Sequence, residues 1–99
     1  MPIDSSYLEN DILLVNAGAT GSAVPVKGGT YVWGCEGTFG GTTATLQLAN
    51  ANGTFVNFPN ATLSANGFVV VSLPVNGSVR VALTGGTPSA MFSNLVSVP

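Results

Sequence analysis

The chain contains no histidine among its 99 residues and only one cysteine, Cys35. Histidine is the usual general base and a common ligand of transition metals, so its absence removes the Ser-His-Asp triad and most such metal sites. A single cysteine excludes a disulfide within the chain. Catalysis by two facing carboxylates is disfavoured, because the chain has only four acidic residues from which such a pair could form. We therefore expect a protein that is not an enzyme, with no catalytic residue, no metal and no cofactor.

Charge is also scarce: 6% of the residues are charged, against about 25% in an ordinary soluble protein. The acids are Asp4, Glu9, Asp11 and Glu36, and the bases are Lys27 and Arg80. Two bases neutralise too few phosphates for nucleic-acid binding, and no apolar run approaches the 18 residues or so of a membrane span. A monomer with so few charges stays in solution poorly. We therefore expect part of the surface to be covered, by a partner or by copies of the same chain.

Residues 1–10 read as an N-terminal arm, followed by one domain over residues 11–99. The first residues lack a basic start and an apolar run, so we expect no signal peptide and synthesis in a cytoplasm. Asp4, Glu9 and Asp11 could offer oxygen ligands to Ca²⁺, but their spacing fits no EF-hand loop, and a solvated arm is the simpler interpretation. Residues 8–15 have either the apolar spacing of a helix or, at 12–15, that of a strand.

Turn signals divide the rest of the chain. Asn-Gly occurs at 52–53, 66–67 and 76–77, and this pair favours type I′ hairpin turns because both central residues need positive φ. We expect Asn52-Gly53 to join strands 42–49 and 54–58, and Asn76-Gly77 to join strands 68–73 and 78–84. The breaks recur about every 9–12 residues, which is typical of a sandwich or barrel of short strands.

Between these breaks, apolar and polar residues alternate with a period of two, as in half-buried strands. We predict about eight strands, at 12–16, 23–27, 30–36, 42–49, 54–58, 61–64, 68–73 and 78–84, with 90–98 as a candidate ninth. Residues 68–73 form a continuous apolar run, which indicates a central strand covered on both faces. The predicted fold class is all-β, either an antiparallel β-sandwich or a jelly-roll-like barrel.

Three local features have alternative interpretations. Residues 34–41 are rich in glycine but lead into a strand instead of a helix, so a flexible or bulged connection fits better than a phosphate loop, and Phe39 would be exposed at its tip. Cys35 lacks a nearby base or cation and reads as a buried apolar residue beside Trp33. The aromatic residues could form a sugar-stacking platform, although most aromatics of a small β domain belong to its core.

The order of these elements carries a resemblance over about residues 17–98. An aromatic strand, Gly-Gly-Thr-Tyr-Val-Trp-Gly-Cys-Glu-Gly-Thr-Phe-Gly-Gly, is followed by Thr-Thr-Ala-Thr-Leu-Gln-Leu-Ala and an Asn-Gly-Thr-Phe-Val hairpin. The pattern ends with the segment Val-Asn-Gly-Ser-Val-Arg-Val-Ala-Leu-Thr-Gly-Gly-Thr-Pro-Ser-Ala, followed by a closing apolar strand. The chain resembles the small β-sandwich virion proteins of tailed bacteriophages that decorate or cement the capsid or anchor head fibres.

The resemblance implies a non-enzymatic structural protein, present in many copies on the capsid surface of a virion. Its partner would be the major capsid protein or another virion protein, and the chain would form a homo-oligomer, with a trimer as one candidate. The expected partner contacts are Pro2, Ile3, Tyr7, Leu8 and Phe39. Two alternatives stay open: a tail, neck or fibre component of the virion, and a carbohydrate-binding or adhesion module.

Overall fold

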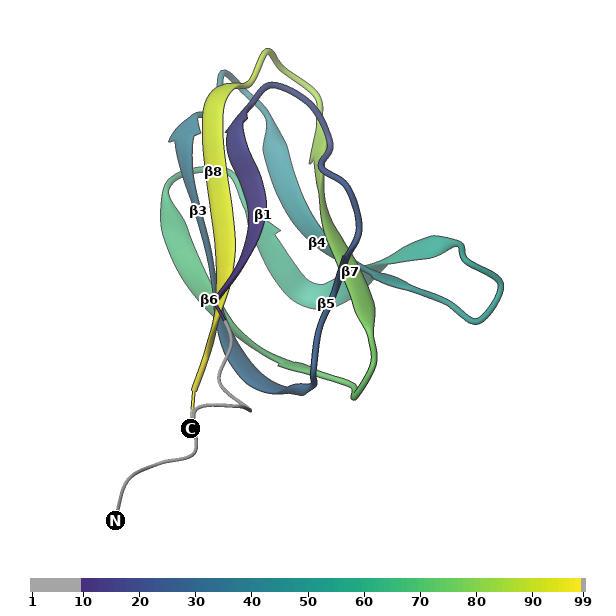
Figure 1. Cartoon of the computed structure of the whole chain (residues 1–99). Coiled ribbons are helices and arrows are strands. Elements are labelled where there is room, and N and C mark those ends of the chain that lie inside the picture. The colour runs from purple at the N-terminus through teal and green to yellow at the C-terminus, as the bar shows by residue number, and fades with distance from the viewer. Residues whose placement is uncertain (1–9, 99) are drawn as a thin grey trace.

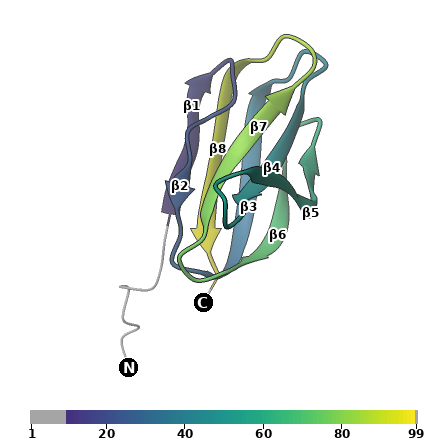
Figure 2. The ribbon, with the colours of Figure 1, turned by 90° about the vertical axis from the view of Figure 1, so that its right-hand side faces the viewer.

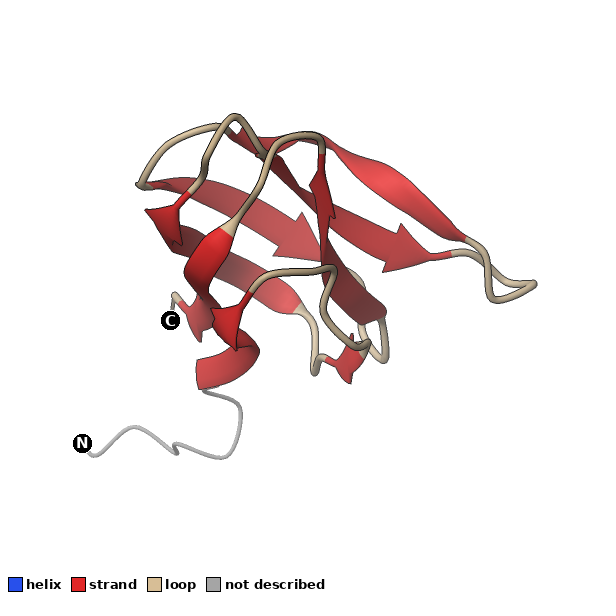
Figure 3. Ribbon diagram, turned by 90° about the horizontal axis from the view of Figure 1, so that it is seen from above, coloured by secondary structure: helices blue, strands red, loops and turns tan. Residues whose placement is uncertain are grey.

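The chain folds into two antiparallel four-stranded sheets that pack face to face, as the computed structural model of residues 10–98 shows (Figure 1). One sheet has the strand order β1-β8-β3-β6 and the other the order β2-β7-β4-β5. The strands are β1 (Asn10–Ala17), β2 (Val24–Pro25), β3 (Gly29–Thr38), β4 (Thr43–Ala49), β5 (Phe55–Leu63), β6 (Gly67–Leu73), β7 (Ser78–Thr84) and β8 (Ser89–Ser97). The described residues contain no helix, as Figure 3 also shows from above.

The pairing of the strands is nested. The first strand pairs with the eighth, the second with the seventh, the third with the sixth and the fourth with the fifth. Such a pattern arises when one long hairpin rolls up, and the contacts of β3 with β8 and of β4 with β7 then complete each sheet. This is the strand order of a jelly roll. The predicted all-β, antiparallel class is confirmed, and Figure 2 shows its two layers.

Most predicted strands correspond to observed ones. The ambiguous segment at 12–15 lies in strand β1, and the candidate ninth strand is β8. The predicted strands 54–58 and 61–64 are parts of one strand, β5, which bulges where Pro59 and Asn60 interrupt its pairing with β4. Pro59 is tolerated there because β5 lies at a sheet edge. Residues 1–9 of the predicted arm lie outside the described residues.

The prediction of type I′ turns is wrong at all three Asn-Gly pairs. Asn52-Gly53 does join β4 to β5, but in a five-residue connection, 50–54, in which only Gly53 has positive φ (the hairpin at the right of Figure 1). Asn76-Gly77 does join β6 to β7, but Asn76 alone has positive φ, in a turn closed by a hydrogen bond from Gly77 N to Pro74 O. Asn66-Gly67 and Asn76-Gly77 connect strands of different sheets, where a tight hairpin has no place.

The core lies between the two sheets and is built around Trp33, which is fully buried. Its indole Nε1 donates a hydrogen bond of 2.8 Å to the Ser93 hydroxyl, which in turn donates to the Gly34 carbonyl at 2.6 Å. The polar groups of the core are thereby satisfied at this point. Among the described residues, the other large, fully buried side chains are Tyr31, Leu46, Met91, Leu95, Val79, Val81 and Thr42.

The glycine-rich connection is bulged, as expected: β3 shifts register between Glu36 and Thr38. The expectation that Phe39 is exposed is wrong, because only 8% of this residue is accessible and it belongs to the core cluster. The connection from β3 to β4 passes from one sheet to the other, so an aromatic ring there can close the end of the core. The gain from burying such a ring, on the order of 1.5–3 kcal/mol, favours this position over an exposed one.

Candidate functional site

The outward faces of the two sheets differ in chemistry. On the β2-β7-β4-β5 sheet, Arg80 Nε donates to Gln47 Oε1 at 2.8 Å, and Gln47 Nε2 donates to Asn57 Oδ1 at 2.9 Å. The Arg80 guanidinium also lies 4.3 Å from the centre of the Phe55 ring. These polar side chains satisfy one another across three strands, so this face can remain in contact with water.

The outward face of the β1-β8-β3-β6 sheet is apolar. Phe68 and Val70 on β6 are 76% and 67% exposed, and they are joined by exposed residues from β1 and β8. We call this surface the apolar face, and its exposed members are Ile12, Val15, Phe68, Val70, Phe92, Val96 and Val98. Among residues 10–98, seven of the nine exposed large apolar residues therefore lie on the face of one sheet, although scattered exposure would be ordinary.

The extent of the apolar face is unusual for a monomer. If the full accessible area of a large apolar residue is taken as roughly 150–200 Å², the exposed fractions leave about 600–800 Å² of these seven residues open to solvent. The largest apolar patch on a typical monomer covers about 300–600 Å². A standard protein–protein contact buries about 800 Å² on each partner. The apolar face therefore has the size of one side of such a contact.

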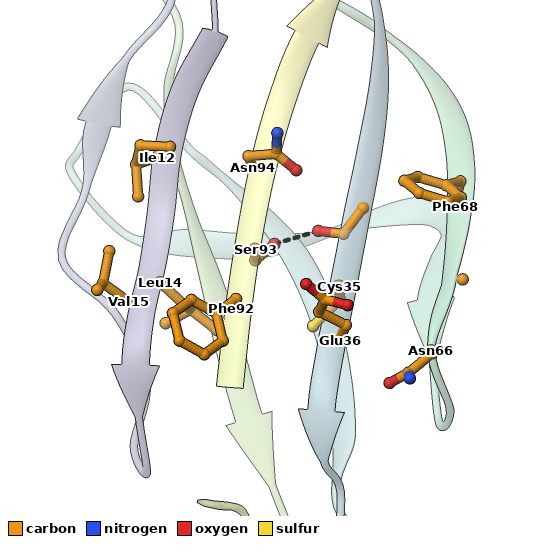
Figure 4. Close-up of a pocket in the computed structure, with 12 residues that line it drawn as sticks. Ile12, Leu14, Val15, Cys35, Glu36, Asn66, Phe68, Phe92, Ser93 and Asn94 are labelled. Carbon is orange, nitrogen blue, oxygen red and sulfur yellow. Dashed lines mark hydrogen bonds between the residues drawn. The ribbon is translucent and has the colours of Figure 1, made fainter. Parts of the chain in front are cut away.

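The strand register gives the apolar face a ridge and a hollow. Val70, Val32 and Val96 are directly aligned across β6, β3 and β8, and they form the ridge. In the neighbouring row, Phe68 and Ile12 stand at the two ends, while Gly34 and Asn94 lie between them. The Phe68 ring leans over Gly34, since a Cβ at Gly34 would lie 2.7 Å from Phe68 Cε1. A hollow of about 510 Å³ on this face is lined by residues that include Ile12, Phe68 and Phe92, as Figure 4 shows.

Polar groups at the hollow are few. Glu36 and Asn66 lie in its lower part in Figure 4, and Asn94 lies near its top, level with Ile12. Asn94 Nδ2 donates to Asn10 Oδ1 at 3.2 Å, and Asn66 Oδ1 accepts from Gly37 N at 3.0 Å, so part of their hydrogen-bonding capacity is already used. The hollow therefore offers chiefly apolar contact, with a small number of hydrogen bonds for orientation.

Cys35 lies beneath this hollow and is 4% exposed, as predicted for a buried apolar residue beside Trp33. Burial raises the pKa of its thiol; a hydrogen bond with Ser93 lowers it, and the nearby carboxylate of Glu36 raises it further. A thiol that keeps its proton is a poor nucleophile. Within residues 10–98, no three His, Cys, Asp or Glu side chains come together as a metal site would need.

The structure places one of the five partner contacts expected from the sequence. Pro2, Ile3, Tyr7 and Leu8 lie outside the described residues, and Phe39 is buried in the core. The expectation of a central, doubly covered strand at 68–73 is wrong, since β6 is an edge strand that pairs with β3. The run itself was the signal for this site: its outward residues, Phe68 and Val70, are as apolar as those of a covered strand, but the described part of the chain does not cover them.

No protein-family model, no curated protein and no solved structure matches the chain. The part of the chain that the structure describes also contains no helix long and apolar enough to cross a membrane.

Proposed function

We propose that the protein is a non-enzymatic structural component of a virus particle, and specifically a decoration or cement protein of a bacteriophage head. The observation that carries this proposal is the apolar face: a contact-sized apolar surface on a chain with only 6% charged residues. An exposed apolar patch of this size marks a site of interaction, and contact with another protein is the use that we propose for it. The resemblance of the element order to phage virion proteins is the reason for proposing a phage head as the assembly.

The fold is compatible with this role, since jelly rolls form many viral capsid domains as well as lectins. A fold alone does not assign a function, so the proposal depends on the surface. On a particle, each copy is held close to its neighbours, and weak contacts therefore add through high effective concentration. The neutral, hydrogen-bonded face with Arg80 and Gln47 suits the wet part of such contacts.

The test is cosedimentation of the purified protein with emptied phage heads that lack it and, separately, with isolated tails. We expect saturable binding to heads and none to tails. Binding to tails or connectors alone would favour the alternative of a tail, neck or fibre component. Binding to no part of the particle would reject the virion role.

A carbohydrate-binding module is the second candidate, and one observation favours it. Two exposed aromatic residues, Phe68 and Phe92, line the hollow together with the carboxylate of Glu36 and the amide of Asn94. Sugar sites combine aromatic rings with such hydrogen-bonding groups. A glycan array is the measurement: a specific hit that is lost in Phe92→Ala and retained in Val75→Ala, a substitution outside the hollow, would promote this candidate above the first.

A further inference from the structure

We infer that the apolar face is the contact between two copies of this chain, packed sheet to sheet around a two-fold axis. The proposed function leaves open what covers this face, and the inference does not rest on that function. Its starting point is the strand β6, whose sequence is that of a covered strand but whose outward residues are among the most exposed in the described chain.

The area supports a second copy as the occupant. The roughly 600–800 Å² that these seven residues leave open on one copy is close to the 800 Å² or so per partner that a standard stable contact buries. A two-fold pair covers both apolar faces in one step, because the same patch is used on each side. No apolar face would then remain in water.

The relief of the face supports self-pairing as well. A two-fold contact requires a surface that fits itself, so protruding groups and hollows must lie side by side on one patch. The apolar face has both: the valine ridge runs along the flank of the hollow, and the Phe68 ring, which leans over Gly34, forms one wall of it. In the pair, the valine ridge of each copy packs into the hollow of the other.

The charge pattern points away from a charged partner. Among the outward-facing residues of this sheet that the structure describes, Glu36 alone is ionisable. It lies beside Phe92, its register partner on β8, and lines the lower part of the hollow in Figure 4. Arg80, whose guanidinium donates to Gln47, lies on β7 in the opposite sheet. The apolar face therefore gains little from a basic or acidic protein and most from a neutral surface like itself.

The experiment measures mass by sedimentation equilibrium over a range of protein concentrations, for the wild type and for matched variants. We expect the wild type to approach twice the 9.9 kDa of one chain. Val70→Lys places a charge on the ridge, and it does so twice in a symmetric pair. We expect it to raise the dissociation constant on the order of 100-fold or more.

Val75→Lys is the control, since Val75 is 74% exposed but lies in the β6–β7 turn, outside the apolar face. It should leave the dissociation constant unchanged. Phe68→Ser tests the same face without adding charge and should also weaken pairing. Circular dichroism spectra show whether each variant keeps the β fold.

Three results would overturn the inference: a wild type that remains a monomer at all concentrations, a trimer, or equal weakening by Val70→Lys and Val75→Lys. These outcomes are separate from the fate of the proposed function. A monomer that binds phage heads would overturn the pairing alone, and a two-fold pair that binds no part of the particle would overturn the virion role alone.

Discussion

The hydrogen-bond chain in the core allows a sharp test of the fold. Ser93→Ala removes the hydroxyl that accepts from Trp33 Nε1 and donates to the Gly34 carbonyl. Trp33 is fully buried and Ser93 is 4% exposed, so water cannot replace the lost partner easily. A buried donor left without a partner costs about 1–3 kcal/mol. In a domain of this size, each kcal/mol corresponds to a fall in Tm of about 4–8 °C.

The assay is urea unfolding followed by circular dichroism, at one fixed protein concentration so that association contributes equally. Ser93→Ala is measured alone and in a Trp33→Phe background, where the indole donor is already gone. We expect the substitution to cost about 1 kcal/mol less in that background, which is the coupling energy of the pair. Ser72→Ala, at an exposed position on β6, should change stability by less than about 0.5 kcal/mol. Equal costs of Ser93→Ala in the two backgrounds would refute the assigned role of the hydroxyl.

Two further predictions concern a glycine and the cysteine. Gly86 and Gly53 both have positive φ, but a Cβ at Gly86 would clash with the Gly40 carbonyl oxygen, whereas a Cβ at Gly53 would meet open space. Gly86→Ala should therefore lower the urea midpoint of unfolding more than Gly53→Ala does. Similar shifts of the midpoint in the two variants would contradict the clash. Because the pKa of the Cys35 thiol is raised in the folded state, its contribution to stability is complete below the unfolded pKa of roughly 8.5 and is lost as the pH rises through the folded pKa. The wild type should thus lose more stability than Cys35→Ala as the pH becomes alkaline. A thiol reagent should also modify Cys35 slowly in the native protein and quickly once urea unfolds the chain. Equally fast modification in the two states would show that the native thiol is accessible.

The strands were predictable because alternation and glycine breaks are local signals. Residues 42–49 and 78–84 alternate cleanly, and both form strands close to the predicted bounds. The turn types were not predictable in this way. Asn66-Gly67 and Asn76-Gly77 have the composition of hairpin turns, but the chain passes there from one sheet to the other, and the path between sheets is decided by packing far along the sequence.

The apolar face was visible in the sequence only in part. The run at 68–73 indicated a strand with two apolar sides, and the sparse charge indicated a covered surface. Which surface is open depends on strand order: β6 lies at an edge, and the registers that align Val70, Val32 and Val96 come from three distant segments. Phe39 is the opposite case, a residue predicted to be exposed that is buried. Its neighbouring glycines indicated an exposed loop, but its ring packs in the core.

The nested strand pairing has a consequence for synthesis of the protein. β8 lies between β1 and β3, so the sheet that carries the apolar face has no continuous centre until β8 has left the ribosome. Before that moment, β1 has none of the neighbours it pairs with in the finished sheet. Folding of this sheet is therefore expected only once β8 has been synthesised, and a nascent chain cut short before residue 89 would lack the strand that joins its two halves. Only chains translated through β8 would then form the complete sheet and its apolar face, so truncated chains could not make the contacts of that face.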